Sequence, residues 1–587
     1  MPFTTRPVIR GTRGVIATGH YLATEAGVHI LRSGGNAIDA GVAAGFCLHI
    51  LEPHQNGVGG EAPILIYSAD RGKPFSINGH GTAPRRATIA WFREQGIDLI
   101  PGNGFLPATV PAAFDSWITA LREFGTMSLA EVLAPALDLA ENGFSMYSGL
   151  REILLAKQEA FLSDWPTSAE VFVAGGRVPE IGEVFRQPLL ASTLSKLLNA
   201  ERDGGRSGRD AGLQSARDLY YKGEIAERIA EFVANTEIMD ATGKSHRGLL
   251  EYDDMAEYSA KVETPEVVNY RGIDVLKCGP WCQGPVMLQQ LALLEGFDLK
   301  ASGHNSADYI HTLAECAKLA FADREAYYGD PEFDDVPMGV LLSKKYAADR
   351  RALVDQALAS DDFRPGDLGR GPLPYDPATA LSHRSHQSQS SRTEAHDTTH
   401  LDVIDAQGNM MSATPSGGWL QSSPVVAGVG FPLGTRGQMF FLDERRPNAL
   451  QPGKRPRTTL TPSLAMKDGK PFMALGTPGG DMQDQWTLQF FLNVVDFGMD
   501  LQEAVDAPTF HTSHFPSSFY PRTMLPKRVV VEERIPENIR EDLMRRGHDL
   551  VVNGPWSHGR VLGIRTMDGL IEGAASPRLE TGYAGGW

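Results

Sequence analysis

The feature that most constrains this chain is the abrupt start of a strand-like run at residue 399. Residues 361–397 before it are crowded with Pro, Gly, Ser, Arg and His and hold few large apolar side chains, so this segment cannot bury enough surface to fold alone. The run that follows is rich in Thr, Leu, Val and Ile, and its Leu401 and Val403 lie two residues apart, which predicts a strand. Residues 406–409 have turn chemistry, and residues 410–414 are predicted to form the returning strand.

A threonine at the start of such a hairpin, directly after a disposable segment, suggests a nucleophile. If the bond between Asp397 and Thr398 is cut, Thr398 gains a free α-amino group beside its own hydroxyl. An N-terminal amine has a pKa of about 7.7–8.0, so it can act as general base for that hydroxyl. The alternative is an ordinary β-hairpin that carries a threonine, and the hairpin alone favours this alternative.

Composition places the chain among large globular enzymes. Its 587 residues are 42% hydrophobic and 22% charged, which predicts one large domain or two intimate ones. The net charge of −17 argues against nucleic acid or an anionic membrane surface as a partner. Four cysteines in a chain of this length do not form a disulfide scaffold. Cys278 and Cys282 lie four apart without a histidine cluster, so we expect buried thiols rather than half of a zinc site.

The pattern of the first residues predicts no targeting signal. Its first residues lack a continuous apolar stretch and a cleavage pattern. No run approaches the roughly 18 apolar residues that a membrane span needs. We therefore expect a soluble, cytoplasmic protein without a secretory signal and without a membrane partner.

Helical spacing of apolar residues is the main pattern between residues 21 and 357. An Ala- and Gly-rich helix at 37–51, small on all sides, is expected to be buried with close neighbours. Residues 204–212, polar and glycine-rich, are expected to form a surface loop. Strands are expected at 15–18 and 64–68, and further helices at 21–32, 129–141, 193–200, 225–233, 309–326 and 345–357.

The residue spacing argues against two candidate sites, a phosphate-binding loop and a metal site. The glycine-rich run 56–60 could be a phosphate loop, but it lacks the Lys-Ser/Thr pair and a preceding βαβ pattern, so a tight turn is favoured. A second group could be a metal site; it consists of four histidines, His383, His386, His396 and His400. No carboxylate or cysteine spacing supports such a site, so no metal is expected.

Strands dominate after residue 398. Segments 463–467 and 470–475 flank Asp468-Gly469, a strong hairpin signal. A helix is expected at 482–497, with Asp481 as its N-cap. The pair Gly479-Gly480 precedes this helix, where backbone N–H groups can approach an oxyanion. The alternative for this pair is a plain turn.

Several motifs in register give the chain a family resemblance. They occur in the same order and span nearly the whole sequence, and together they resemble the gamma-glutamyltranspeptidase family. The motifs lie at residues 27–40, 109–113, 323–324, 329–331, 397–400, 454–456 and 478–480.

The resemblance implies an autoprocessed N-terminal-nucleophile hydrolase, an α+β protein with a four-layer αββα sandwich and a helical lobe. Residues 1–397, with their tail at 361–397, would form the large subunit, and residues 398–587 the small subunit. It implies a small-molecule amide substrate, no cofactor, and association of the two subunits of one precursor. A homodimer of such heterodimers is left open.

The resemblance also implies residue roles. Cleavage between Asp397 and Thr398 would expose Thr398 as the nucleophile. Ser416 falls where the family keeps a second, supporting hydroxyl. The remaining positions would hold the oxyanion (Gly479 and Gly480) or line the acyl pocket (Thr458, Thr459 and Gln438).

The chain departs from the family at the residues that bind the glutamate part of the substrate. The Arg that holds the α-carboxylate is replaced by Ile89, and the acid that holds the α-amino group falls near Phe441. The family's Asn after the second hydroxyl is Gly418, and residues 442–454 are too few to carry a lid loop. Ile89 and Phe441 are therefore substrate-facing positions with altered chemistry.

Three hypotheses follow. The first is an N-terminal-threonine amidohydrolase or acyltransferase with a non-standard acyl group. The second is a true γ-glutamyl hydrolase or transferase acting on glutathione or related compounds through other residues. The third is an uncleaved, non-enzymatic binding protein, against which the intact set of Thr398, Ser416 and Gly479-Gly480 argues.

Overall fold

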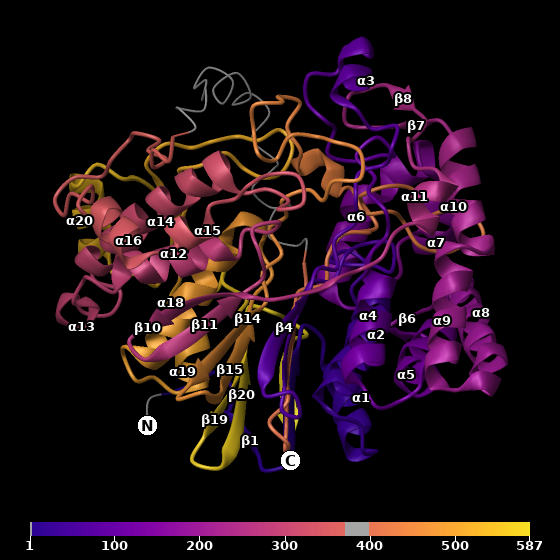
Figure 1. Cartoon of the computed structure of the whole chain (residues 1–587), viewed down its shortest axis with the longest axis horizontal. Helices are drawn as coiled ribbons and strands as arrows, with labels where there is room; N and C mark the ends of the chain where they lie inside the picture. Colours follow the sequence, from indigo (N-terminus) through magenta and orange to yellow (C-terminus); the bar gives the residue numbers. More distant parts are fainter. Residues whose placement is uncertain (1–2, 370–397) are drawn as a thin grey trace.

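The computed structural model describes residues 3–369 and 398–587, which form two seven-stranded sheets with helices on both outer sides (Figure 1). Strand and helix bounds follow the sequence pattern closely in the core. The central strands, such as Gly14–Thr18 and Leu401–Asp405, are buried at every position, because each sheet packs one face against the other sheet and one against helices.

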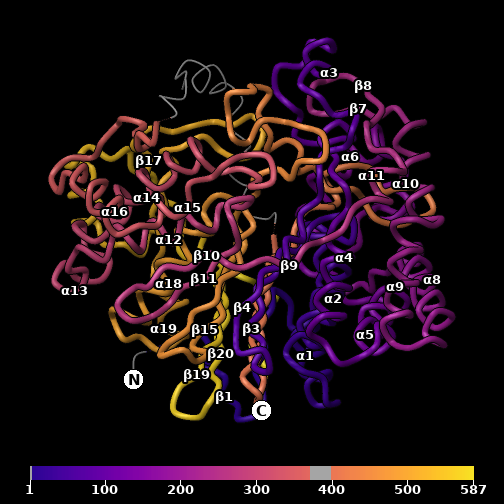
Figure 2. Tube along the Cα trace, in the orientation of Figure 1, coloured from indigo at the N-terminus to yellow at the C-terminus, as the bar shows by residue number. Residues whose placement is uncertain are grey.

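The first sheet combines strands from both sides of the 397–398 bond. Figure 2 shows segments from the beginning and the later part of the chain running together within it. Every pairing in it is antiparallel. Its strands, in spatial order, are β21 (Tyr583–Gly586), β2 (Gly14–Thr18), β12 (Leu401–Asp405), β13 (Met410–Ala413), β3 (Ile64–Ser68), β4 (Lys73–Ile77) and β9 (Val262–Glu263).

The second sheet is also antiparallel. Its hairpin between β14 and β15 turns at Asp468 and Gly469, which have φ of 53° and 71°, as the hairpin signal predicts. Its strands, in spatial order, are β1 (Ile9–Gly11), β20 (Leu570–Ala575), β19 (Leu562–Met567), β15 (Lys470–Gly476), β14 (Ser463–Lys467), β11 (Ile273–Lys277) and β10 (Glu266–Tyr270).

Three apolar layers hold this sandwich together. One lies between the sheets, where Val15, Ile404, Leu464 and Ile564 are fully buried. The other two lie between each sheet and its helices. The first sheet is covered by α1 (Tyr21–Arg32), α2 (Ala37–Leu51) and α4 (Ala113–Phe124), and the second by α12 (Pro285–Leu294), α14 (Ala307–Tyr327), α18 (Gln483–Val495) and α19 (Leu501–Asp506).

Helix α2 is buried along its whole length, as its small residues predict. A Cβ at Gly41 would lie 2.4 Å from Met411 Sδ of β13, and one at Gly45 would lie 2.6 Å from the indole ring of Trp117 in α4. The helix therefore needs glycine at both positions to fit between the sheet and α4.

A helical lobe packs beside the first sheet's helices (Figure 1). It contains α5 (Leu129–Asn142), α6 (Ser148–Ser163), α7 (Pro166–Phe172), α8 (Pro188–Gly204), α9 (Arg209–Tyr221) and α10 (Glu224–Asn235). The smaller helices are α3 (Ile89–Glu94), α11 (Tyr252–Ala256), α13 (Leu299–Ser302), α15 (Met338–Leu341), α16 (Lys344–Arg351) and α20 (Glu537–Arg545). The remaining strands are β5 (Phe144–Ser145), β6 (Val184–Phe185), β7 (Ile238–Met239), β8 (Ser245–His246), β16 (Phe510–Thr512), β17 (Arg528–Glu532) and β18 (Asp549–Asn553).

Four local expectations differ from the structure. The helix expected at 345–357 ends at Arg351. Most of the loop expected at 204–212 is helical: α8 ends at Gly204, a 3-10 helix spans Gly205–Ser207, and α9 begins at Arg209. Asp481 does not cap α18, since its carboxylate is bound to Arg324 instead. Residues 361–369 are anchored rather than loose, for example through Gly366 N, which donates to Asp323 over 2.7 Å; residues 370–397 lie outside the described residues.

All four cysteines are buried free thiols, as expected of a chain without a disulfide scaffold. Within residues 3–369 and 398–587, no helix is both long enough and apolar enough to cross a bilayer.

Candidate active site

The hydroxyl of Thr398 lies at the buried end of the first sheet. Thr398 is fully buried and forms an isolated antiparallel bridge with Ser416 just before β12 begins. The Oγ atoms of Thr398 and Ser416 lie 3.1 Å apart, within hydrogen-bond distance. The two hydroxyls that the sequence singled out are therefore direct neighbours.

Ser416 is held by an ion pair that sequence reasoning missed. Arg436 donates from Nη2 to Ser416 Oγ (2.5 Å) and from Nε to Glu61 Oε2 (3.2 Å). Glu61 also exchanges two backbone hydrogen bonds with Ser416. Burial raises the pKa of Glu61 to about 7, and Arg436 opposes that shift. Two buried residues, Arg436 and Glu61, thus hold Ser416 and its hydroxyl beside Thr398.

The glycine-rich run 56–60 packs against this network. A Cβ at Gly60 would lie 2.2 Å from the carbonyl oxygen of Ser416, and one at Gly59 would lie 2.1 Å from that of Pro432. Glycine is needed there so that the turn can deliver Glu61 to Ser416. The turn interpretation of this run therefore explains its composition.

Gly479 and Gly480 form a loop between β15 and α18. Both have positive φ, 128° and 52°, which glycine adopts readily. The loop leaves β15 at Gly476, where a Cβ would lie 2.3 Å from the ring of His400. Because His400 is two residues from Thr398, this contact places the start of the loop near the Thr398 end of β12.

Arg324 fixes the glycine loop. Its guanidinium donates to the carboxylate of Asp481, directly after Gly480, and to Gln283 Oε1 (2.9 Å). Gln283 in turn donates from Nε2 to the carbonyl of Gly480 (3.4 Å) and from its backbone N–H to that of Thr458 (2.8 Å). The loop and the pair Thr458-Thr459 are thereby tied to one framework.

Thr458 and Thr459 are buried, and Thr458 lies against His80. Thr458 Oγ1 is 3.2 Å from His80 Nε2, and burial holds the pKa of His80 well below its usual value. Thr459 Oγ1 has no hydrogen-bond partner among the described residues. A hydroxyl that is buried and unpaired suits contact with a bound substrate.

Gln438, Phe441 and Ile89, which the resemblance assigned to the substrate, each have contacts within the protein. Gln438 Nε2 donates to the carbonyl of Gly102, and its Oε1 accepts from Tyr520 N, both over 3.0 Å. Ile89, 8% exposed, packs in an apolar cluster that includes Phe440. Two guanidinium groups, those of Arg446 and Arg522, lie over the ring of Phe441.

Comparison with known proteins agrees with this architecture. The chain matches the gamma-glutamyltranspeptidase family over residues 23–586. This chain belongs to the gamma-glutamyltranspeptidase family. Membership makes it an N-terminal-nucleophile amide hydrolase or transferase, and the expected fold class and family are confirmed.

Three relatives show the range of this family. The glutathione hydrolase-like YwrD proenzyme of Bacillus subtilis (strain 168) is 33% identical over 573 residues, which cover 97% of each chain. The structure of LmbA2991HD is 45% identical, with a TM-score of 0.91 and complete coverage of both chains. The cephalosporin acylase from Bacillus halodurans is 30% identical, with a TM-score of 0.83 and coverage of 100% and 98%.

The departures from the transpeptidase pattern have structural reasons. Gly418 has φ of 60°, and a Cβ there would lie 2.7 Å from Gly60 N. An asparagine at this position would therefore collide with the turn that delivers Glu61. Three arginines near the family motifs could offer a substrate carboxylate another partner, but each is in an ion pair: Arg85 with Glu257, Arg86 with Glu251, and Arg457 with Glu325.

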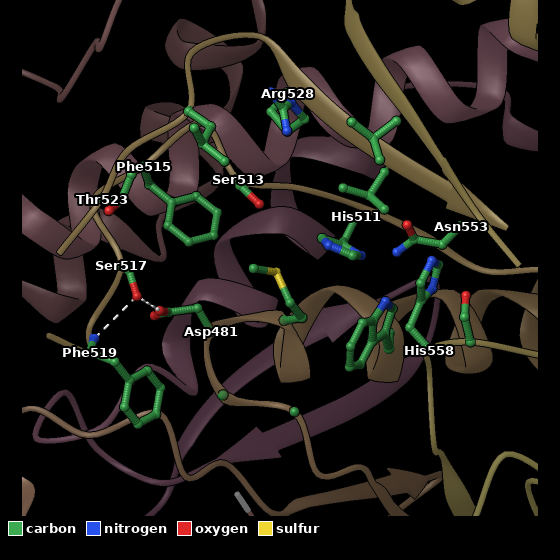
Figure 3. A pocket seen from close by; sticks show the side chains of 18 of the residues that line it. Asp481, His511, Ser513, Phe515, Ser517, Phe519, Thr523, Arg528, Asn553 and His558 are labelled. Atoms are coloured by element: carbon green, nitrogen blue, oxygen red, sulfur yellow. Dashed lines mark hydrogen bonds between the residues drawn. The ribbon is translucent and has the colours of Figure 1, made fainter. Parts of the chain in front are cut away.

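A cavity of about 390 Å³ borders the glycine loop (Figure 3). Gly479 and Gly480 line it, together with Trp486, His511 and His558. Burial lowers the pKa of His558 to about 3 and that of His511 well below its usual value, so both rings are neutral near pH 7. Figure 3 shows that Phe515, Phe519, Asp481 and Arg528 also border this space, so its lining is of mixed polarity.

One histidine and carboxylate cluster lies away from Thr398. His311, Glu315 and His548 bring ligand atoms within 4.8 Å of one another. Glu315 is already bound to Lys318 (2.5 Å), and the two histidines bond to each other (2.8 Å). Of the four histidines weighed as a metal site, only His400 lies within the described residues, where its Nδ1 is 2.9 Å from Thr414 Oγ1.

Proposed function

We propose that this transpeptidase-family chain is an autoprocessed amidohydrolase whose nucleophile is Thr398. The supporting geometry is the buried chain of Thr398, Ser416, Arg436 and Glu61. Cleavage before Thr398 would supply the amine that serves as base. The segments 1–397 and 398–587 would then be its large and small subunits.

The proposed reaction passes through an ester. Thr398 Oγ attacks the amide carbonyl while its proton moves to the α-amine of the same residue. Gly479 and Gly480 N–H groups stabilise the oxyanion. The C–N bond then breaks, and the amine leaves with that proton. Water, or an acceptor amine, attacks the acyl-Thr398 ester, gives one proton back through the α-amine and restores the hydroxyl.

The acyl group is proposed to lack an α-ammonium. The observation that carries this proposal is the charge around Phe441: the guanidinium carbons of Arg446 and Arg522 lie 4.2 and 4.1 Å from the centre of its ring. A substrate ammonium placed here would meet two like charges. The acid closest in sequence, Asp443, is already bound to Arg445 (2.8 Å).

A γ-glutamyl hydrolase is the second candidate. The similarity to a protein named as glutathione hydrolase-like favours it. It requires that an ammonium find a partner outside the residues identified above. This function predicts that γ-glutamyl compounds, including glutathione, are the better substrates.

The deciding experiment compares two anilides that differ only in the α-amino group. We expect kcat/KM for glutaryl p-nitroanilide to exceed that for γ-glutamyl p-nitroanilide by on the order of 10²-fold, because one charged hydrogen bond is lost and like charges are added. A tenfold advantage for the γ-glutamyl compound, about 1.4 kcal/mol, would establish the second candidate.

A further inference from the structure

The cavity of about 390 Å³ beside the glycine loop (Figure 3) has a lining that the proposed reaction does not explain. Gly479 and Gly480 form one side of it, but Thr398 and Ser416 are not among its lining residues in the described chain. The other sides come from α18, from every second residue of the segment 513–525 and from the three-stranded sheet of β16, β17 and β18. Its volume lies within the range of small-molecule sites, so the cavity is a candidate binding site in its own right.

Four polar side chains on this lining make no side-chain hydrogen bond in the described part of the chain. They belong to Ser513, Thr523, Asn553 and Ser557. Figure 3 shows Ser513 and Asn553 bordering the same space as His511. A hydroxyl or an amide offers both donors and acceptors, so the cavity has hydrogen-bonding capacity that the protein itself does not use.

Flat ring surfaces form much of the remaining lining. Trp486 stacks on His558, with ring centres 5.7 Å apart and ring planes inclined by 3°. Phe515 stacks on Phe321, which lies outside the lining, with ring centres 3.9 Å apart. These stacks hold the lining rings in place, and a planar ring of a ligand can stack on such surfaces or meet them edge-on.

The charged groups of the lining are already paired. Asp481 is bound to Arg324 and accepts from Ser518 Oγ (2.6 Å). Arg528 forms an ion pair with Asp549 (2.7 Å), and both lining histidines are neutral near pH 7 because burial lowers their pKa. A charged ligand would have to break one of these pairs or lose its hydration without compensation, so the cavity favours an uncharged molecule.

Trp486 connects the cavity with the glycine loop. A Cβ at Gly479 would lie 2.2 Å from Cζ3 of Trp486, so the indole ring packs directly on the Cα of Gly479. A molecule that rests on this ring constrains it, and the ring in turn constrains the loop whose N–H groups are assigned to the oxyanion. A ligand of the cavity is therefore in a position to change the rate of the chemical step.

We propose that this cavity is a second ligand site, which takes an uncharged molecule with a flat ring and hydrogen-bonding groups at its edge and acts on the glycine loop through Trp486. Binding depends on the cavity alone. The effect on turnover rests on the proposed amidohydrolase function, because it requires that Gly479 and Gly480 hold the oxyanion.

The binding test uses two probes that differ only in charge. 2-Naphthamide has a fused flat ring and an uncharged amide that donates and accepts hydrogen bonds, whereas 2-naphthoate carries a carboxylate in its place. Calorimetry on wild-type protein is expected to show that the amide binds at least tenfold more tightly than the carboxylate. Equal affinities, or no binding of the amide, would overturn the assignment.

Matched variants on one strand locate the binding. Val551 lines the cavity, whereas the next residue of β18, Val552, is 42% exposed and outside the lining, because successive strand side chains point to opposite faces. Val551→Trp fills the cavity and is expected to weaken 2-naphthamide binding at least tenfold, while Val552→Trp should leave it within twofold. Leu525→Trp fills the cavity from another segment and decides the matter if Val551→Trp does not fold, as judged by circular dichroism. Unchanged affinity in the folded filling variants would place the probe elsewhere.

The turnover test distinguishes a second site from part of the substrate pocket. Saturating 2-naphthamide is expected to change kcat for glutaryl p-nitroanilide at least twofold and to leave KM within twofold, because the loop acts on the transition state. The filling variant that folds should abolish this effect, and Val552→Trp should retain it. A rise in KM with unchanged kcat would show competition with substrate and overturn the second site.

The outcomes separate this proposal from the proposed function. A protein that is uncut and hydrolyses no anilide refutes the amidohydrolase, while 2-naphthamide binding still reports on the cavity. A protein that hydrolyses glutaryl p-nitroanilide but does not bind 2-naphthamide retains the amidohydrolase and refutes the second site. Binding in the cavity without any change in kcat refutes the coupling through Trp486.

Discussion

Arg455 and Asp330 form a buried ion pair that joins the two proposed subunits. Arg455 donates from Nη2 to Asp330 Oδ1 (2.6 Å) and from Nε to Asp330 Oδ2 (2.9 Å). The two residues lie on opposite sides of the 397–398 bond, in two motifs that carry the family resemblance. Together with the shared first sheet, this pair is expected to keep the pieces associated after cleavage.

Breaking this pair should weaken the structure. Arg455→Met leaves Asp330 buried without its main counter-charge, so we expect a loss of about 3–5 kcal/mol in unfolding free energy. Urea unfolding of the uncut Thr398→Ala protein measures it. The matched control is Arg93→Met, whose partner Glu444 also lies across the bond but where both side chains are more than half exposed; there the expected loss is below about 1 kcal/mol. Equal losses in the two variants would contradict the role given to Arg455.

The glycine loop is expected to matter for rate more than for stability. Gly480→Val forces a β-branched residue to φ of 52° and displaces the N–H groups, so kcat should fall by roughly 10²–10³. Gly469→Val is the control, since Gly469 has φ of 71° in the exposed β14–β15 turn, and a Cβ there would meet no described atom within 4 Å. It should lose comparable stability with kcat retained. Near-wild-type turnover in a folded Gly480→Val protein would place the oxyanion elsewhere.

The structure also predicts a specific pH dependence for Glu61. Its pKa rises from 4.5 to about 7 on folding, so the folded state binds more protons than the unfolded state between these values. Its stabilising contribution is therefore complete below pH 4.5 and is lost as the pH rises through 7. Between pH 4.5 and 8 the unfolding free energy of the Thr398→Ala protein should fall by about 3 kcal/mol relative to Thr398→Ala with Glu61→Gln. A difference that is flat with pH would show that the pKa of Glu61 is not shifted.

Activity is expected to persist without metal. The proposed chemistry uses a hydroxyl, an amine and backbone N–H groups, none of which needs a metal ion. Turnover of glutaryl p-nitroanilide should be unchanged after dialysis against EDTA. Loss of turnover that a divalent cation restores would contradict the mechanism.

Local patterns were sufficient for much of the fold. The apolar spacing from Tyr21 to Arg32 predicted α1 with its observed bounds, and Asp468-Gly469 predicted the β14–β15 hairpin. The prediction that Asp481 caps a helix was wrong because a distant arginine, Arg324, binds its carboxylate. Such long-range electrostatic partners leave no local signal.

In the candidate site, too, local motifs were predictable from the sequence and long-range partners were not. Thr398 and Ser416 could be named from motifs, but Glu61 and Arg436 are 375 positions apart, and neither has a periodicity that indicates its partner. Arg522 was missed because only the folded chain places its guanidinium over the ring of Phe441. The one available signal was the proximity in sequence of Arg436 to Gln438.

The most direct test of the account is the N-terminus of the smaller chain. Purified protein should separate on a denaturing gel into chains of 397 and 190 residues, and Edman sequencing of the smaller one should begin Thr-Thr-His-Leu. Thr398→Ala should remain a single, inactive chain. Full activity in wild-type protein that stays uncut, or a smaller chain that begins at another residue, would contradict the account.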